Sequence, residues 1–244
     1  MAEHRSVILG ATSSLAQAVV RRLAASDEAL VLVARDPDKL ARVEADLVAR
    51  GAAVTMHVAD LDDTDAHDAL LARCGNADGY WLFQGVLPDQ AACERDWNKA
   101  AAALHTNFSS VASLLTRIAN RLESQERGCI VVVGSVAGDR GRGSNYVYGS
   151  AKGALSLFAQ GLRNRLSKRG IVVVTIKPGF IDTSMTAAIE KKPALLWASA
   201  DRVAADMVRA RDRAVDVRYS PWFWRPIMMI VRCIPERLFK RLSL

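Results

Sequence analysis

Residues 6–17 read SVILGATSSLAQ, an apolar strand that leads into a turn of small residues and then into a helical pattern. Gly10 permits the tight turn, and the small residues after it let backbone N–H groups approach a ligand. A helix N-terminus at this place favours a pyrophosphate electrostatically. Taken alone the motif is weak, because Ser14 and Ala16 stand where a glycine-rich fingerprint has its later glycines. A Ser-capped helix after a strand explains the segment equally well.

Apolar runs like the first recur along the chain, with helix-period stretches between most of them. The predicted strands are Val7–Leu9, Leu30–Ala34, Val54–Val58, Tyr80–Phe83, Ile130–Val133, Ile171–Ile176 and, more weakly, Val215–Tyr219. The predicted helices are Leu15–Ala25, Pro37–Arg50, Asp65–Arg73, Ala100–Arg121, Lys152–Arg169 and Ala200–Ala210. Runs that are apolar throughout indicate a sheet buried on both faces. We therefore expect a single α/β domain with a doubly wound Rossmann fold, in which helices flank a central parallel sheet of about seven strands.

The ends of the second and third predicted strands carry charged residues that suit a dinucleotide. Arg35 ends the second strand about 20 residues after the first turn, where this fold reads the ribose. An acidic residue there would bind both ribose hydroxyls, whereas Arg35 suits a 2′-phosphate. A solvated charge leading into a helix is the alternative. The sequence thus predicts NADP(H) as the preferred cofactor and NAD(H) as the alternative, with Asp60-Leu61 near the adenine.

A serine, a tyrosine and a lysine follow in an order that suits proton transfer to a carbonyl oxygen. Ser135 follows a predicted strand, and thirteen residues later Tyr148 and Lys152 lie one helical turn apart. A phenol has a pKa of about 10, which the neighbouring ammonium and a positive nicotinamide are expected to lower. Lys152 can also hold the nicotinamide ribose, while Ser135 donates a hydrogen bond to the substrate oxygen. Tyr146 cannot take this role, because its i+4 partner is Ser150.

A Tyr–Lys pair alone is common by chance, but its place between strand-end Ser135 and Pro178-Gly179 is not. In these motifs nearly the whole chain resembles the short-chain dehydrogenases/reductases. The resemblance implies the catalytic residues Asn107, Ser135, Tyr148 and Lys152, of which Asn107 kinks its helix and helps to hold a water for proton relay. The expected cofactor-binding residues are Gly10, Thr12, Ser13, Ser14, Leu15, Arg35, Asp60, Leu61, Gly85, Tyr148, Lys152, Pro178, Gly179, Ile181 and Thr183. Among them, the Ile181 backbone and Thr183 are implied to contact nicotinamide.

The chain departs from the family pattern in two places. The glycine loop is degenerate, and Phe83-Gln84-Gly85 replaces the usual Asn-Ala-Gly after the fourth strand. The sheet-bracing role of that Asn is therefore expected to be vacant. Neither change removes a group that touches the transferred hydride, so an active oxidoreductase is expected.

Several stretches resemble a narrower branch, the decaprenylphosphoryl-2-keto-erythro-pentose reductases and their bacterial relatives. They are Gly85-Val86-Leu87 with Asp89, residues 137–142 (AGDRGR) with Ser144-Asn145, and residues 223–229 (FWRPIMM). This resemblance implies reduction of a ketone to a secondary alcohol on a keto-sugar carried by a polyprenyl phosphate. A 3-oxoacyl or steroid ketone reductase is the alternative. A non-catalytic nucleotide-sensing protein on the same fold is disfavoured, because such proteins commonly lose the Tyr or Lys that this chain keeps.

Residues 221–244 are expected to form a C-terminal amphipathic extension of a dinucleotide-binding catalytic domain, residues 1–220. The extension mixes aromatic and aliphatic residues with five cations, namely Arg225, Arg232, Arg237, Lys240 and Arg241. Such a pattern suits peripheral contact with an anionic membrane, and equally an element that packs over the substrate pocket or a subunit.

The predicted loop between Ser135 and Tyr148 carries two further cations. Arg140 and Arg142 are candidate ligands of a substrate phosphate, since guanidinium groups bind phosphate through paired hydrogen bonds. An arginine satisfied by Asp139 or by solvent is the alternative.

The composition indicates which classes of partner and which cellular compartment to expect. A net charge of +7, much of it Arg on predicted helix faces, fits a solvated surface as well as attraction to anionic ligands or membranes. No aromatic–basic platform suggests a nucleic-acid partner, and the four cysteines lack metal spacing. Without a signal-peptide pattern or an apolar run of ~18–20 residues, we expect a cytoplasmic protein, at most peripheral at the inner face of the membrane. A small-molecule ketone or alcohol substrate and a homodimer or homotetramer are expected.

Overall fold

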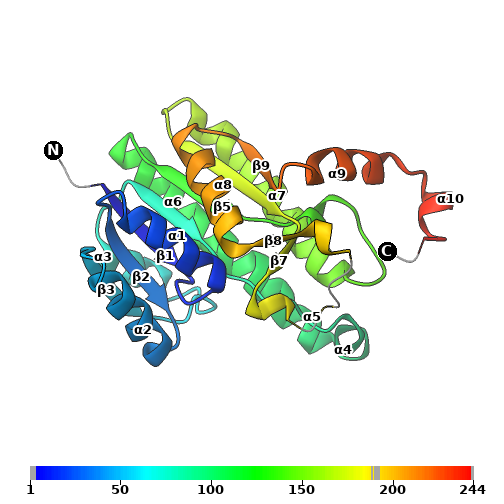
Figure 1. Cartoon of the computed structure of the whole chain (residues 1–244), viewed down its shortest axis with the longest axis horizontal. Helices are drawn as coiled ribbons and strands as arrows, with labels where there is room; N and C mark the ends of the chain where they lie inside the picture. Colours follow the sequence, from blue (N-terminus) through cyan, green and yellow to red (C-terminus); the bar gives the residue numbers. More distant parts are fainter. Residues whose placement is uncertain (1–3, 188, 190–192, 243–244) are drawn as a thin grey trace.

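A seven-stranded parallel sheet forms the centre of the protein, with the strand order β3-β2-β1-β4-β5-β6-β9 (Figure 1). The computed structural model describes residues 4–187, 189 and 193–242. The strands are β1 (Arg5–Leu9), β2 (Ala29–Ala34), β3 (Val54–Val58), β4 (Gly79–Leu82), β5 (Cys129–Val133), β6 (Val172–Pro178) and β9 (Val217–Ser220). The predicted α/β fold with about seven parallel strands is therefore confirmed. The strand order reverses between β1 and β4, which opens a crevice beyond their carboxyl ends.

Helices cover both faces of this sheet, each over its own hydrophobic core. One layer consists of α1 (Ser14–Ala24), α2 (Pro37–Val48) and α8 (Ala200–Asp212). The other consists of α3 (His67–Cys74), α6 (Ser110–Gln125) and α7 (Tyr146–Ser167). Successive residues of a strand face opposite sides, so Val7 and Leu9 enter one core and Ile8 the other. This double burial explains why most of the strands are apolar throughout.

The helix predicted over Ala100–Arg121 is interrupted. It consists of α5 (Trp97–Leu104), a π-helical turn η1 (His105–Ser109) and α6. Helical periodicity does not reveal a π turn, because the apolar spacing on either side stays close to 3.6 residues. A short helix α4 (Gln90–Arg95) precedes α5 and was not predicted.

Helix α7 starts at Tyr146, six residues before Lys152, where the helical pattern was predicted to start, and two before Tyr148. Tyr148 and Lys152 therefore share one continuous helix, and their spacing of one turn holds them on the same face.

A second, smaller sheet follows β6 at the carboxyl edge of the main one. Its parallel strands are β7 (Phe180–Asp182) and β8 (Trp197–Ser199). The short 3₁₀ turns η3 (Ser184–Thr186) and η4 (Ala194–Leu196) lie between them. The sequence did not predict these strands, because three residues carry no readable periodicity. The Phe180 and Trp197 rings stack with their centres 5.3 Å apart, which joins the two strands.

Residues 221–242, here called the C-terminal arm, extend beyond the body of the protein next to β9 (Figure 1). The arm contains α9 (Trp224–Cys233) and α10 (Glu236–Phe239). Trp224 and Met228 are buried in a small cluster with Val136, whereas Met229 and Ile230 on the outer side are 62% and 68% exposed. The arm thus has a buried apolar side and an exposed side that carries further apolar residues. Among the described residues, no helix has the length and apolar character needed to cross a membrane.

Candidate functional site

Two adjoining pockets occupy the crevice beyond the carboxyl ends of the strands. The β5 pocket is lined by Ser135, Tyr148 and Lys152 together with the stretch after β6, and the β2 pocket by Arg35 and Asp60. Both are lined by the turn after β1 and by Gln84-Gly85 after β4. Every predicted cofactor-binding residue lines one pocket or the other. The structure therefore brings together in one crevice residues that lie up to 173 positions apart, Gly10 and Thr183.

The turn after β1 is shaped by Gly10. Its φ of +86° lies in the left-handed region, and a β-carbon there would come within 3.1 Å of the Gln84 backbone nitrogen. The next residues start α1, where the Ser13 hydroxyl accepts a hydrogen bond from the Ala16 N–H at 3.1 Å. Ser14 lies across from Ser184, with their hydroxyl oxygens 3.5 Å apart. The N-terminus of α1 thus faces the junction of the two pockets, where a phosphate would be favoured.

The β2 pocket contains charges of both signs. Arg35 is exposed, and no ion pair of its own is found among the described residues. Lys39, in the first turn of α2, lines the same pocket, and its ammonium lies 3.0 Å from Asp36. Sequence reasoning missed this second cation, although a lysine four residues after Arg35 at a helix start was a readable signal. Asp60 lines the same pocket.

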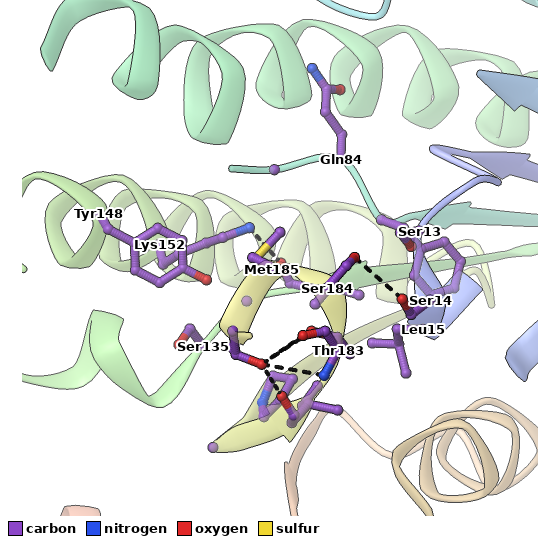
Figure 2. A pocket seen from close by; sticks show the side chains of 18 residues that line it. Ser13, Ser14, Leu15, Gln84, Ser135, Tyr148, Lys152, Thr183, Ser184 and Met185 are labelled. Atoms are coloured by element: carbon purple, nitrogen blue, oxygen red, sulfur yellow. Dashed lines mark hydrogen bonds between the residues drawn. The ribbon is translucent and has the colours of Figure 1, made fainter. Parts of the chain in front are cut away.

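In the β5 pocket the Tyr148 and Lys152 side chains extend side by side from α7, with Ser135 on the neighbouring loop (Figure 2). The Lys152 ammonium donates a hydrogen bond to the Val133 carbonyl oxygen at 3.0 Å and lies 5.9 Å from the centre of the Tyr148 ring. A β-carbon on Gly85 would come within 3.3 Å of that ammonium. The same β-carbon would lie 2.8 Å from Asn107 Oδ1, so the segment at Gly85 packs closely against both side chains.

Burial shifts the pKa of both groups on α7. It raises the pKa of Tyr148 to about 12, against the opposing effect of the Ser135 hydroxyl, and it lowers the pKa of Lys152 to about 8. The sequence predicted a lowered pKa for Tyr148. Within the protein alone the direction is the reverse, because desolvation of the phenolate outweighs the stabilisation by its neighbours. The expectation also included the positive charge of a bound nicotinamide, which would lower the pKa of Tyr148.

Asn107 lines neither pocket and is fully buried in the π-helical turn η1. Its amide nitrogen donates to the Val86 and Ala103 carbonyl oxygens, both at 2.9 Å, and its oxygen accepts from the Val86 N–H at 3.1 Å. The side chain thereby holds the segment after β4 against the helix. The irregular helix accords with the kink that the family resemblance implies, whereas the water relay stays a prediction.

Gln84 corrects the expectation that the bracing position after β4 is vacant. Its side chain points away from the β5 pocket (Figure 2), and its amide nitrogen contacts Asp62 Oδ1 at 2.8 Å and Ser110 Oγ at 2.7 Å. A weaker bond runs to the Leu61 carbonyl oxygen at 3.3 Å. The longer Gln side chain thus reaches acceptors on the loop after β3 and on α6, and it ties three elements together.

Arg140 and Arg142 line neither pocket. Arg140 is satisfied by protein, as the alternative allowed, but its partner is Glu236 of the arm at 2.6 Å and not Asp139. Arg142 is half-buried, and burial lowers its pKa. Their role as phosphate ligands gains no support from this placement.

Several pocket residues were not predicted from the sequence. Beyond Lys39 and Gln84, they include Ser184, Met185 and Thr186 of η3, which line the β5 pocket after Thr183. Figure 2 shows Ser184 and Met185 next to Thr183. The polar run that continues past the Pro178-Gly179 stretch was the only available signal. Among the described residues, no group of His, Cys, Asp and Glu side chains is arranged to hold a metal ion.

Comparison with known proteins adds an independent line of evidence. A family model described as short chain dehydrogenase matches residues 5–194. An uncharacterized oxidoreductase of Mycobacterium tuberculosis is 39% identical over 241 residues, which cover 97% of this chain and 96% of that protein. The 3-oxoacyl-[acyl-carrier-protein] reductase of Escherichia coli is 27% identical over 188 residues, covering 75% and 76%. A short-chain dehydrogenase from Sphingobium yanoikuyae, solved in complex with NADPH, superposes with a TM-score of 0.83 at 24% identity, covering 96% and 97%.

The lowered pKa of Lys152 predicts a pH-dependent effect of Lys152→Met on stability. A lysine in the unfolded chain titrates near 10.5, so between pH 8 and 10.5 the folded protein binds fewer protons than the unfolded one. Below pH 8 the buried charge destabilises the fold, and this penalty disappears as the pH rises. Relative to the variant, the wild type should gain about 2–3 kcal/mol in free energy of unfolding from pH 7 to pH 10. Urea unfolding at both values measures it.

The matched control is Lys168→Met, which removes an exposed lysine from the end of the same helix. Its stability difference from the wild type should change little over this range. An equal pH dependence for both variants would show that Lys152 is not destabilised as a cation.

Proposed function

The chain belongs to the short-chain dehydrogenase family, and on that premise we propose that it is an NADP(H)-dependent enzyme that reduces a ketone to a secondary alcohol. The family makes it an oxidoreductase. The observation that carries the finer proposal is the meeting of Ser135, Tyr148 and Lys152 in one pocket with the stretch from Pro178 to Thr183. The assignment of each residue to a role, given below, belongs to the same proposal.

The residues of the crevice fit a nicotinamide dinucleotide. Gly10 and Gly85 line the crevice without a side chain, and the N-terminus of α1 suits the pyrophosphate. Arg35 and Lys39 suit a 2′-phosphate at the far end, while Ile181 and Thr183 suit the nicotinamide. The NADPH bound to the Sphingobium yanoikuyae protein supports this assignment. When bound, the nicotinamide supplies the hydride.

The three side chains of the β5 pocket handle the oxygen of the substrate. Ser135 donates a hydrogen bond to the carbonyl oxygen, which gains negative charge as the carbon is reduced. Tyr148 then gives its proton to that oxygen. With a pKa near 12 its hydroxyl is protonated at neutral pH, which suits the reductive direction. Lys152, with a pKa of about 8, is mainly cationic at pH 7, so it stabilises the phenolate left behind and can hold the ribose.

For the substrate we propose a keto-sugar on a polyprenyl phosphate, in line with the narrower resemblance. The C-terminal arm supports a lipid-linked substrate, because its inner face packs on Val136, directly after Ser135, while its outer face exposes apolar side chains. A 3-oxoacyl thioester is the second candidate, favoured by the similarity to the Escherichia coli reductase. The loss of NADPH absorbance with a polyprenyl-phosphate keto-sugar, a 3-oxoacyl thioester and a steroid ketone distinguishes these classes.

Tyr148→Phe should fold and bind NADPH but lose nearly all turnover, because it lacks only the hydroxyl that transfers the proton. Tyr146→Phe is the matched control, since Tyr146 lies two residues earlier in α7 and is exposed. Its rate should stay within about twofold of the wild type. If Tyr148→Phe keeps more than about a tenth of the rate, another group is the acid.

NADPH should bind more tightly than NADH, and Arg35→Asp should narrow or reverse the preference by repelling the 2′-phosphate. Lys39→Met should weaken NADPH binding by a smaller factor, because Asp36 shares its charge. Arg42→Asp is the control, an equal charge change on an exposed residue of α2 that lines neither pocket. Fluorescence titration measures the dissociation constants. If the wild type binds NADPH and NADH equally tightly, the proposed preference for NADP(H) is wrong.

The arm is further proposed to contact anionic membranes at the cytoplasmic side, as an extension of the catalytic domain. Trp222, Ile230 and Leu238 are 62%, 68% and 55% exposed, and exposed cations accompany them. Aromatic and aliphatic groups with cations at their margins suit the lipid headgroup region. Assembly as a homodimer or homotetramer stays a prediction, for which the arm is an alternative contact.

Reversing Arg232, Arg237 and Lys240 to Glu should reduce co-sedimentation with phosphatidylglycerol-containing vesicles, because each cation near the surface contributes about 1 kcal/mol. Secondary structure and NADPH binding should persist. The control reverses Arg42, Arg202 and Arg213, exposed cations outside the arm, with the same change in net charge. If the wild type never sediments with such vesicles at low salt, the arm is a packing or subunit-contact element.

A further inference from the structure

The turn that follows Ser135, η2 (Val136–Asp139), lies directly on the backbone of α7. A β-carbon on Gly138 would come within 2.6 Å of the Gly153 nitrogen, and one on Gly149 within 2.9 Å of the Ala137 carbonyl oxygen. No side chain separates the turn from the helix at these points. Tyr148 directly precedes Gly149, and Lys152 directly precedes Gly153. The turn therefore contacts α7 at the positions that carry the reacting groups.

The turn also determines how the Ser135 hydroxyl is held. Ser135 Oγ accepts a hydrogen bond from the Ala137 N–H at 3.1 Å, and the Ser135 carbonyl oxygen accepts one from the Gly138 N–H at 3.2 Å. A shift of this single turn would therefore move the hydroxyl within the β5 pocket.

The far end of the turn is fixed to the sheet through Asp139. Its side chain is 2% exposed, and it accepts hydrogen bonds from the Lys177 ammonium and, at 2.8 Å, from the Tyr219 hydroxyl. Lys177 belongs to β6 and Tyr219 to β9, so these contacts attach the turn to two strands of the sheet.

The next residue, Arg140, attaches the turn to the C-terminal arm instead. Its guanidinium donates to Glu236 Oε2 at 2.6 Å and to the Arg232 carbonyl oxygen at 3.3 Å, and it lies 4.4 Å above the centre of the Phe239 ring. The Arg140 side chain is only 20% exposed. Phe239 is 6% exposed although it ends a helix of four residues, so this contact buries the ring.

The arm also packs against the first residue of the turn. Val136 is buried with Trp224 and Met228 of α9. The Trp224 indole lies against Gly179, a lining residue of the β5 pocket, so closely that a β-carbon on Gly179 would clash with it. The arm therefore contacts both ends of the turn and the opposite wall of the pocket.

We propose that Arg140 is a positioning residue, which clasps the C-terminal arm to the turn after Ser135 and so sets the Ser135 hydroxyl for the reaction. The inference rests on the proposed function, in which that hydroxyl binds the substrate oxygen. It gives the arm a role in the active site that is separate from any membrane contact. It also replaces the phosphate-binding role predicted for Arg140, since the guanidinium is engaged by three partners of the arm.

The contact of Arg140 with the arm residues Arg232, Glu236 and Phe239 is here called the clasp. A double-mutant cycle with Arg140→Met and Glu236→Gln tests it. Activity is measured with NADPH and whichever ketone of the panel above is reduced fastest. Arg140→Met should lower kcat roughly tenfold and Glu236→Gln roughly threefold, while the double variant is no slower than Arg140→Met, because residues acting through one contact are not additive. The KM for the ketone should stay within about twofold, because the Ser135 bond strengthens in the transition state.

The control is Glu126→Gln, which breaks an exposed Arg–Glu pair with Arg169 far from the turn and should leave kcat unchanged. A phosphate-binding Arg140 gives the opposite pattern, with a raised KM for the phosphate-bearing ketone at constant kcat and no effect of Glu236→Gln. That outcome overturns the proposal.

The aromatic contact allows a rescue experiment. Phe239→Leu removes the ring under the guanidinium and should lower kcat, whereas Phe239→Tyr keeps the ring and should restore it. If both variants act alike, the ring does not hold Arg140 and the clasp fails.

Amide hydrogen exchange provides a readout that needs no substrate. Exchange at Val136–Asp139 should accelerate in Arg140→Met and Glu236→Gln but not in Glu126→Gln, because only the first two release the turn. If the wild type reduces no ketone, the proposed function fails, yet the exchange rates still decide whether the clasp exists. Unchanged exchange in both variants overturns the proposal.

Discussion

In this protein the turn after β5 rests on the backbone of helix α7, and glycines on both sides of the contact make this approach possible. Gly138 faces the helix at Gly153, where added β-carbons would fall within 2.6 and 3.0 Å of backbone atoms. Ser135 comes from the sheet and Tyr148 and Lys152 from the helix, so their meeting depends on this distance. A side chain at either glycine would push the turn and the helix apart and so move Ser135 away from Tyr148 and Lys152. The rest of the site is arranged around this contact.

Burial determines the pKa values of the two groups that this contact places near Ser135. Tyr148 and Lys152 lie in one desolvated pocket, and their pKa values shift in opposite senses, to about 12 and about 8. Both shifts disfavour charge, as expected for groups removed from water. At neutral pH the pocket thus holds a protonated phenol next to an ammonium that is close to its titration point. Such a pair can give up a proton to a carbonyl oxygen without a free charge being stranded in the interior.

Side-chain hydrogen bonds hold the loop between β4 and α4 that carries Gly85. The Asn107 side chain, in the π-helical turn, forms hydrogen bonds with the backbone of Val86. The Gln84 side chain donates hydrogen bonds to Asp62 and Ser110. The departure from the family at position 84 therefore did not leave the strand end unsupported. The longer Gln84 side chain supports this strand end through hydrogen bonds to the loop after β3 and to α6.

The sequence by itself determined the alternating strands and helices, the parallel sheet and the order of its pocket residues, because these follow from local periodicity and strand-end chemistry. Gly10, Arg35, Asp60 and Ser135 could be named as candidates for the same reason, since each follows a predicted strand, whereas Ile181 and Thr183 were named through the family resemblance. The strands β7 and β8 were beyond its reach, because three residues carry no period.

Only the tertiary structure decided which long-range partners the remaining side chains found. Gln84 and Arg140 have no local signal that names Asp62 or Glu236 as a neighbour. The raised pKa of Tyr148 likewise depends on burial, which is a property of the packed chain. Periodicity is a property of consecutive residues, whereas contacts across 96 positions, such as Arg140 with Glu236, arise only when separate elements pack together.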